Sequence, residues 1–440
     1  MIILPSLEIV PAKFNGNILL SQIPVNGTGD FTVSRALNTA TRVNSSGNIE
    51  VVNADTPRID YFASGGVVGC PALLVEPSGT NTLSGSVSID TGWILSSVST
   101  TSGIVSPNGS NDATLFEALV NTARVRQTAT LASGSTYTFS CFGKFGALSS
   151  GFSLNVFDEN AISYGSGVCQ AFNLNEGTLG ASGTIGAGFT LQSVGMENYG
   201  NGWYRCRMTV LLSYTPTTPR VGFRIGTQIS GRPLSIPSGT VNVWGAQLEV
   251  GSVATSYIPT TTAAVTRNAD VISVSGAVSG SIGQTQGTMY AEVDVRNWVN
   301  PGRIFSISDG TSNNRIMTLF NSSNRFRVIV DVSGSSAQAD ISSASLSNGI
   351  HKIAVGYAAN DVVFYVDGVL VGSDNTANIP ACSQVFLGKI EAAGSTLFMN
   401  DRILGAALYT TRLTNTQLAL LTSPYTSYSS MASALSYTLG

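Results

Sequence analysis

Apolar and polar residues alternate with a period of two along most of this chain, in short runs separated by Gly, Asn, Ser and Pro clusters. Such alternation is typical of β-strands with one buried face, and stretches with a helical period are nearly absent. Tyr137, Phe139 and Cys141, for example, lie on one face of a predicted strand, whereas Thr138 and Ser140 lie on the other face, which we expect to be solvated. The pattern predicts an all-β protein built from β-sandwiches.

A second predicted strand covers residues 203–210 and places Trp203, Arg205 and Arg207 on the face opposite its apolar residues. An aromatic ring beside two guanidinium groups suits acidic or hydroxyl-rich glycans, because sugar rings stack on aromatic faces and guanidinium groups donate hydrogen bonds. These three residues are therefore candidate carbohydrate-binding residues. For Trp203, packing at the edge of the core is the alternative.

The other three tryptophans fall into two groups. Trp244 alternates with apolar residues, so we expect it in the core. Trp93 and Trp298 lie near loop signals and are further carbohydrate-binding candidates, since an exposed aromatic ring offers a sugar a large apolar surface.

The pattern changes around a Pro- and Thr-rich segment, Tyr257 to Ala264, which predicts a linker between two sandwiches. We expect residues 271–425 to fold alone as a cooperative β domain. The predicted regions are an N-terminal β-rich region (1–80), a first sandwich (81–262), a second sandwich (271–423) and a C-terminal tail (424–440).

Two short motifs predict local structure in the second sandwich. Asp367-Gly368 stands between two apolar runs and predicts a tight hairpin. Thr414 and Gln417 match a capping box at the start of a short helix, and Pro424 predicts its end.

Charged residues make up only 11% of the chain, well below the roughly 25% of an average globular protein. A surface rich in hydroxyl groups suits a secreted or virion protein. The net charge of −3 and the scattered cations argue against nucleic acid as a partner, because phosphate binding needs clustered cations. We expect no membrane insertion and no signal peptide, since Pro5, Glu8 and Pro11 interrupt the apolar N-terminus.

The cysteines are odd in number and lack the spacing of metal ligands. We expect them to be small buried apolar residues without a disulfide framework, in a chain that folds in a reducing cytoplasm. They are Cys70, Cys141, Cys169, Cys206 and Cys382.

Glu292 and Asp294 resemble part of the Glu-x-Asp-x-x-Glu signature of laminarinase-type glycoside hydrolases, in which two carboxylates supply nucleophile and general acid. The third carboxylate is missing, because Arg296 and Asn297 follow. Strand alternation explains the pair more simply, as a charged row on a half-exposed strand. We predict no catalytic residue.

His351 is the only histidine, which excludes a histidine-based triad or a multi-histidine metal site and favours a packing or hydrogen-bonding role. Asp309 and Asp401 lie near turns, where carboxylates can help to hold a structural calcium ion, but their spacing matches no calcium loop. We predict no cofactor and no metal site, with a structural calcium ion as the open alternative.

Several longer segments resemble known families. Most of residues 31–81, with the words SRALNTATRVNSSGNIEVVNADTPRIDY and GCPALLVEPSGTN, resembles a segment that precedes lectin-like domains in phage tail and fibre proteins. The words GSTYTFSCFGKFG, GNGWYRCRM and VWGAQLEVGS resemble jelly-roll carbohydrate-binding modules. NGIHKIAVGY and VVFYVDGVLVGS resemble concanavalin A-like, laminin-G type sandwiches, although Ile350 replaces the Trp of that family pattern.

These resemblances imply a non-enzymatic bacteriophage virion structural protein of a tail fibre, tail or head appendage, on the virion surface after assembly in the host cytoplasm. Residues 1–80 would attach to other virion proteins, and the sandwiches would display host-adhesion surfaces that bind a host-surface glycan. Such proteins are usually homo-oligomers, often trimers. The alternatives are a decoration or adaptor protein that binds only other virion proteins, and a polysaccharide depolymerase.

Overall fold

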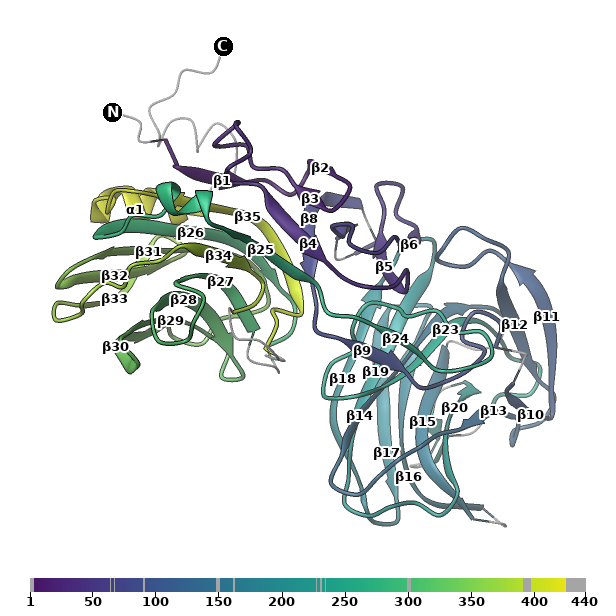
Figure 1. Cartoon of the computed structure of the whole chain (residues 1–440). Coiled ribbons are helices and arrows are strands. Elements are labelled where there is room, and N and C mark those ends of the chain that lie inside the picture. The colour runs from purple at the N-terminus through teal and green to yellow at the C-terminus, as the bar shows by residue number, and fades with distance from the viewer. Residues whose placement is uncertain are drawn as a thin grey trace.

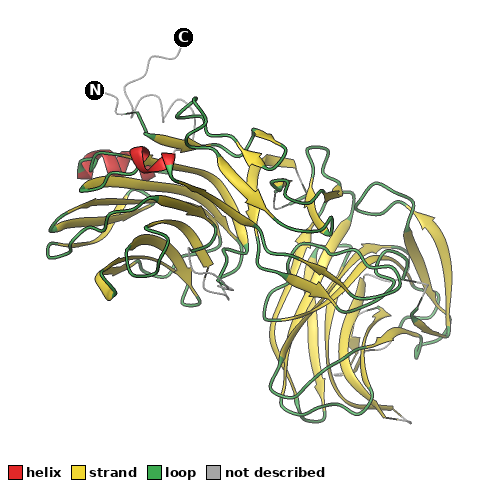
Figure 2. Cartoon of the chain, viewed as in Figure 1, coloured by secondary structure: helices red, strands yellow, loops and turns green. Residues whose placement is uncertain are grey.

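The computed structural model describes residues 4–424 except 64, 67, 90–91, 148–150, 161–162, 227, 230–231, 234, 299–301 and 391–396. Strands account for 54% of the chain and helices for 3%, which confirms the all-β fold class (Figure 2). Two β-sandwiches lie at an angle to each other, and most of the N-terminal strands lie along one sandwich and above the other (Figure 1). No described helix is long and apolar enough to cross a membrane.

The first sandwich consists of two antiparallel six-stranded sheets, called sheets I and II. Inward side chains of both sheets form one core, in which Phe116 of sheet II packs edge-on against Phe223 of sheet I. In order across the sheet, sheet I contains β10 (Ile94–Ser96), β13 (Arg124–Thr128), β20 (Pro219–Ile225), β15 (Gly151–Asn160), β16 (Ser163–Asn173) and β17 (Thr178–Ile185). Sheet II contains β11 (Val98–Ile104), β12 (Ala113–Ala118), β23 (Thr240–Val250), β14 (Thr136–Phe145), β19 (Trp203–Leu212) and β18 (Phe189–Asn198).

The second sandwich consists of an eight-stranded sheet III and a nine-stranded sheet IV. Sheet III contains β33 (Val369–Asp374), β32 (Asp361–Val366), β31 (Gly349–Ala358), β26 (Gln286–Val295), β35 (Asp401–Tyr409), β8 (Val68–Val75) and β7 (Ile59–Phe62), and β1 (Leu7–Ile9) also pairs with β35. Sheet IV contains β2 (Phe14–Asn15), β3 (Ile18–Leu19), β4 (Phe31–Ser34), β25 (Val271–Ser275), β34 (Gln384–Leu387), β27 (Gly302–Ser308), β28 (Arg315–Asn321), β29 (Arg325–Val332) and β30 (Ser335–Ser342).

Short elements complete the fold. Two-stranded pairs are formed by β5 (Ala40–Val43) with β6 (Ile49–Val52), β9 (Gly79–Asn81) with β24 (Val265–Arg267), and β21 (Gln228–Ile229) with β22 (Arg232–Pro233). The helices are the 3₁₀ helix η1 (Ala277–Ser281) and the α-helix α1 (Asn415–Thr422).

The N-terminal residues supply strands to both sheets of the second sandwich. Strands β1 and β8 pair with β35 of sheet III, and β4 pairs with β25 of sheet IV. The structure thereby revises the picture of a separate region 1–80 and of a self-sufficient domain at residues 271–425, because both divisions cut through shared sheets. Strands β35 and β25 form backbone hydrogen bonds with strands that precede the first sandwich in sequence. Without those strands, the edges of β35 and β25 would be unpaired.

The local motifs of the second sandwich are confirmed. Asp367 and Gly368 form the two-residue turn between β32 and β33, with positive φ angles of 48° and 83°. Thr414 and Gln417 form a reciprocal capping box on α1, and Pro424 follows the helix.

The outer face of sheet II is not solvated, contrary to the expectation for Thr138 and Ser140. Both residues are buried, and a second hydrophobic cluster covers part of this face. The residues that pack on this face come from β5, β6 and the segment 253–260, and they include Val43, Ile49 and Tyr257. The N-terminal region and the linker therefore use the outer face of the first sandwich as a docking surface, which the alternation of a single strand does not reveal.

None of the five cysteines forms a disulfide in the described part of the chain, and four of them are buried as expected. Cys70, in β8, is exposed, which corrects the expectation for that residue. Burial raises the pKa of the Cys169 thiol to about 11, so it stays protonated at neutral pH.

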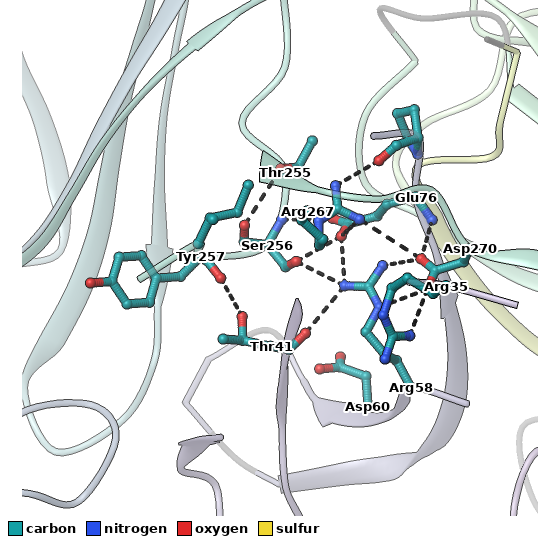
Figure 3. Close-up of polar contacts among 12 residues, drawn as sticks. Arg35, Thr41, Arg58, Asp60, Glu76, Thr255, Ser256, Tyr257, Arg267 and Asp270 are labelled. Atoms are coloured by element: carbon teal, nitrogen blue, oxygen red, sulfur yellow. Dashed lines mark hydrogen bonds and ion pairs between the residues drawn. The ribbon is translucent and has the colours of Figure 1, made fainter. Parts of the chain in front are cut away.

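A buried ion network fixes the N-terminal region to the linker and to the second sandwich (Figure 3). Arg58, two of whose nitrogens bind Asp270, also donates to Glu76 Oε2 (2.7 Å), and Arg35 Nη1 lies 2.9 Å from Asp270 Oδ1. Arg267 completes the network at 3.1 Å from Glu76 Oε2. Their side chains are at most 5% exposed, so each charge depends on the others for compensation.

The electrostatics of the network agree with this geometry. Burial opposes ionisation of Glu76, but Arg267 and Arg58 lower the pKa of its carboxyl group well below the usual range. Ser256 of the linker donates to both oxygens of Glu76 at 2.7 Å, through its backbone N–H and its hydroxyl group. The network thus joins segments that are far apart in sequence.

Candidate functional site

Two adjoining cavities, of about 560 and 270 Å³, lie between the two sandwiches and together form what we call the inter-sandwich cleft. Arg207, Arg296 and Asn348 line both cavities. Concave polar surfaces with converging side chains are the usual form of ligand sites. The larger cavity is also lined by Phe62, Gly65, Glu176, Gly177, Met196, Glu197, Asn198, Tyr204, Asp294 and Gly349, and the smaller one by Ser193, Val194, Asn297, Trp298, Ser322 and Asn324.

Arg207 enters the cleft from the outer face of β19 and is partly exposed, as the strand alternation predicts. Its guanidinium group lies over Gly195 of the adjacent strand β18, where an added Cβ would come within 2.4 Å of Arg207 Cζ. No side-chain hydrogen bond or ion pair joins Arg207 to another residue in the described part of the chain. Its five N–H donors are therefore open to a ligand.

Arg296 follows β26 and is held by both sandwiches. Its backbone N–H donates to Asp401 Oδ2 (2.6 Å), and its Nε lies 3.3 Å from Asp401 Oδ1. Its Nη1 lies 3.9 Å from Glu197 Oε1 of the first sandwich, and its guanidinium carbon is 5.0 Å from the ring centroid of Phe62. Arg296 consequently fixes the geometry of the cleft.

Arg402 of β35 also packs against Phe62, which lines the larger cavity. Its Nε lies 2.6 Å from Asp60 Oδ2, and its Nη1 donates to Asp294 Oδ2 and to the Phe62 carbonyl oxygen, each at 3.0 Å. Its guanidinium carbon lies 4.9 Å from the Phe62 ring centroid. Asp60 and Asp294 are therefore already paired.

Two carboxyl groups at the cleft respond differently to their surroundings. Burial opposes ionisation of Glu197, but Arg296 and Arg207 bring its pKa below the ordinary value. Burial raises the pKa of Asp401 to about 6, although Arg296 and its backbone N–H favour the charged form. Asp401, which forms an ion pair with Arg296, therefore changes its charge near pH 6.

Trp298 lines the smaller cavity, but its ring is only 4% exposed and packs against Phe320 and Phe326. The expectation of an exposed stacking ring is wrong for this residue, because the core of the second sandwich absorbs the ring. Its buried Nε1 has no hydrogen-bond partner in the described part of the structure. Because this atom is buried, the N–H group is not exposed to a ligand in the cavity.

Trp203 and Arg205 do not form the exposed platform that the sequence suggested. Trp203 is 2% exposed and donates its Nε1–H to the Val105 carbonyl oxygen (3.2 Å). Arg205 is 3% exposed, lies over the Phe142 ring and donates to Ser140 Oγ (3.1 Å). Both side chains are buried because the N-terminal region and the linker pack on the outer face of sheet II. Arg207 lies where this packing ends.

The remaining tryptophans are buried. Trp93 is 7% exposed and donates its Nε1–H to the Gly85 carbonyl oxygen (3.3 Å), so its expected place at an exposed loop is wrong. Trp244 lies in the core as predicted.

The candidate catalytic pair behaves as a charged strand row. Tyr290, Glu292 and Asp294 are half-buried on one face of β26, whereas Ala291 and Val293 point into the core. Asp294 is ion-paired with Arg402, as described above.

His351 has the predicted structural role. Its Nδ1 lies 2.6 Å from Asp367 Oδ2 in the hairpin turn, and its Nε2 lies 2.9 Å from the Ser347 carbonyl oxygen. Its ring packs against Trp298 and Phe326.

The two carboxylates considered for calcium have protein partners. Asp309 is exposed and accepts from Thr311 and Asn314 in its own turn. Asp401 is not a turn residue on the surface but is 1% exposed at the start of β35. No group of three or more metal-ligating side chains occurs among the residues that the structure describes.

Sequence reasoning missed Phe62, Glu197 and Asn348, which come to the cleft from the N-terminal region, the first sandwich and the second sandwich. None of them stands in a motif, because the cleft exists only where three distant segments meet. Arg207 alone carried a usable signal, since strand alternation put a cation on an outer face.

Comparisons with known proteins agree with the fold of the second sandwich. Residues 267–419 match the family model of the concanavalin A-like lectin/glucanases superfamily. No curated protein matches the chain.

Similar solved structures include the CBM40 of Ruminococcus gnavus IT-sialidase bound to α2,3-sialyllactose, with 12% identity, a TM-score of 0.30 and coverage of 33% of this chain and 88% of that one. The NanB sialidase from Streptococcus pneumoniae, as its K499G mutant, has 15% identity, a TM-score of 0.30 and coverage of 35% and 27%. A pentraxin from Limulus polyphemus has 18% identity, a TM-score of 0.25 and coverage of 32% and 70%. Residues 267–419, whose strands lie in the second sandwich, are thus similar to the concanavalin A-like lectin/glucanases superfamily, over less than half of the chain.

Proposed function

We propose that this chain is a non-enzymatic structural protein of a bacteriophage virion, in a tail fibre, tail or head appendage, that binds a host-surface glycan in the inter-sandwich cleft. The observation that carries the binding proposal is the uncommitted guanidinium group of Arg207 in a polar cavity beside a concanavalin A-like sandwich. The virion role rests on the resemblance of residues 31–81 to segments of phage tail and fibre proteins.

The chemistry of the cleft suits a hydroxyl-rich ligand. Sugar hydroxyl groups act both as donors and as acceptors, and the cleft offers both kinds of partner. Arg207 and the Asn348 amide provide donors, and Glu197 provides an acceptor. The Tyr204 ring at the wall of the larger cavity adds apolar surface.

The carboxylates at the cleft favour binding over hydrolysis. A glycosidase needs a pair of carboxyl groups, one of them available as an acid, on either side of the scissile bond. Asp294 is ion-paired with Arg402, and the 1% exposed Asp401 is held by Arg296. Because both carboxyl groups are already ion-paired, they support a non-enzymatic role.

Apolar side chains near the N-terminus support attachment to other virion proteins through residues 1–80. Val10, Phe14 and Val25 are 41%, 38% and 93% exposed. Exposed apolar side chains that form a contiguous patch are common in protein–protein contacts. They also support the second candidate, a decoration or adaptor protein that binds only virion proteins. Homo-oligomer formation is part of the main proposal, because fibre and appendage proteins usually assemble in that way.

Three measurements on the full chain test the proposal. Binding to a glycan array supports adhesion, and its absence together with binding to isolated virion proteins supports the adaptor function instead. Release of reducing sugar from host capsule would contradict the non-enzymatic role. Labelled antibody against the chain should mark the appendages of intact particles, and particles without label would contradict the virion role.

A further inference from the structure

The outer face of sheet I carries a cluster of arginines that converge on one carboxylate. Arg124 Nη2 and Arg126 Nε, both from β13, lie 3.1 and 2.8 Å from Glu159 Oε1. Arg220 Nε, from β20, lies 2.9 Å from Glu159 Oε2. We call these four residues the arginine cluster.

Strand alternation determines the face on which the cluster lies. Val125 and Phe223 point into the core of the first sandwich and form a register pair between β13 and β20. The arginines before and after Val125 therefore point outward. The cluster belongs to sheet I, whereas Arg207 of the cleft belongs to sheet II, so the two sites are on different sheets of the sandwich.

The cluster has more positive than negative charge. In the described part of the chain, three guanidinium groups lie within ion-pair distance of the single carboxylate of Glu159. The side chains of Arg126, Arg220 and Glu159 are 12%, 16% and 14% exposed, so water screens this excess only in part. Asp158, the next carboxylate along the chain, accepts from the backbone N–H groups of Thr217 and Thr218 and is held at that turn.

Like charges held close together at half-buried positions destabilise a fold unless an anion offsets them. Arginine is suited to that anion, because its planar fork of N–H groups matches a carboxylate or a sulfate with two parallel hydrogen bonds. Three arginines are too few for the phosphate row of a nucleic acid, and the chain as a whole is negative, at −3.

We propose that the arginine cluster is a second glycan-binding site, which takes the anionic group of an acidic polysaccharide against Arg126 and Arg220. Glu159 preorganises the two guanidinium groups in the free protein and competes with the ligand for them. The site goes beyond the proposed function, since it is independent of the inter-sandwich cleft.

The test uses the full chain and four variants: Arg220→Gln, Glu159→Gln, Arg207→Ala and, as a control, Arg327→Gln. Arg327 forms an exposed pair with Asp340 in the second sandwich. The probes are an oligogalacturonate, sulfated dextran, neutral dextran and a single-stranded oligonucleotide. Calorimetry measures affinity, and a thermal melt confirms that each variant is folded.

The expected result is oligogalacturonate binding that weakens about tenfold in R220Q, because one charge-assisted hydrogen-bond pair is lost. Binding should tighten severalfold in E159Q, because the competing carboxylate is removed, and should be unchanged in R327Q, whereas R207A reports any contribution of the inter-sandwich cleft. A merely structural cluster would not bind more tightly after loss of Glu159. The carboxylated and sulfated probes decide which anion the site prefers.

Three results would overturn the proposal. They are the absence of binding to both anionic glycans, equal affinity for neutral dextran, and an affinity for the oligonucleotide as high as for the glycans. If R207A weakens binding as much as R220Q does, the probe binds in the cleft. That result would support the proposed function but contradict a separate site.

Discussion

Arg207 of the first sandwich and Arg296 of the second line the same cavities, yet only Arg296 is held by ion pairs. Arg296 bridges Asp401 of its own sandwich and Glu197 of the other. The site therefore combines a fixed wall with a guanidinium group that has no ion pair in the described part of the chain. A site of this kind depends on the relative position of the sandwiches, so residues that fix this position also affect binding.

The contact between Arg207 and Gly195 gives a prediction about positioning. Gly195→Ala places a methyl group where Arg207 Cζ now lies, 2.4 Å from the new Cβ, and should displace the guanidinium group. We expect severalfold weaker glycan binding on an array, with a loss of less than about 1 kcal/mol in the free energy of unfolding, because the displaced group is the end of a flexible side chain. Gly280→Ala is the control, since no atom lies within 4 Å of that position. Unchanged binding by G195A would show that Arg207 needs no defined position.

The buried ion network predicts a large loss of stability. Asp270→Asn leaves three buried arginines with Glu76 as the remaining carboxylate, and should lower the free energy of unfolding by about 3–5 kcal/mol. Asp340→Asn, which breaks an exposed pair, should cost at most about 1 kcal/mol. Denaturant unfolding measures both. Equal losses in the two variants would contradict the interlocking role of the network.

Asp401 predicts a pH dependence with a definite sign. Its folded pKa of about 6 exceeds the model-peptide value of 3.8, so the folded state binds more protons between these values. Stability from this group is present at low pH and falls as pH rises from about 4 to 6, by up to about 3 kcal/mol. The difference in unfolding free energy between wild type and D401N should therefore change across this window. If the unfolding free energies of wild type and D401N change with pH in the same way, the raised pKa of Asp401 is excluded.

The shared sheets predict that residues 271–424 alone do not melt cooperatively, because β35 and β25 lose β1, β8 and β4. A deletion of residues 82–264 is the matched test. Asn81 and Val265 are register partners in an antiparallel pair, so a two-residue turn can join them. This shortened chain should melt cooperatively. A cooperative melt of the 271–424 fragment at the same temperature would restore the boundary expected from sequence.

Local sequence signals predicted local structure well. The Asp367-Gly368 turn, the Thr414 capping box and the alternation of β26 depend on neighbouring residues, and the structure confirms all three. The exposure of Trp203 and Arg205 depends instead on the N-terminal region and the linker, which are distant in sequence and cover sheet II. Period-two alternation identifies two faces of a strand but does not reveal what packs on the second one.

The candidate site was predictable only in part for the same reason. Arg207 and Trp298 were identified as candidates, but the Trp298 ring is buried in the core and offers no stacking face. Arg58 and Asp270 stand in no motif, because a buried ion network needs no fixed spacing along the chain.

The most direct test of the central claim is a glycan-array measurement of the full chain beside R207A, with R327A as the control for loss of an exposed arginine. We expect wild type and R327A to bind the same glycans. We expect R207A to bind them about tenfold more weakly, with an unchanged melting temperature. Equal binding by R207A and wild type, or no glycan bound by any of the three proteins, would contradict the inter-sandwich cleft as the glycan site.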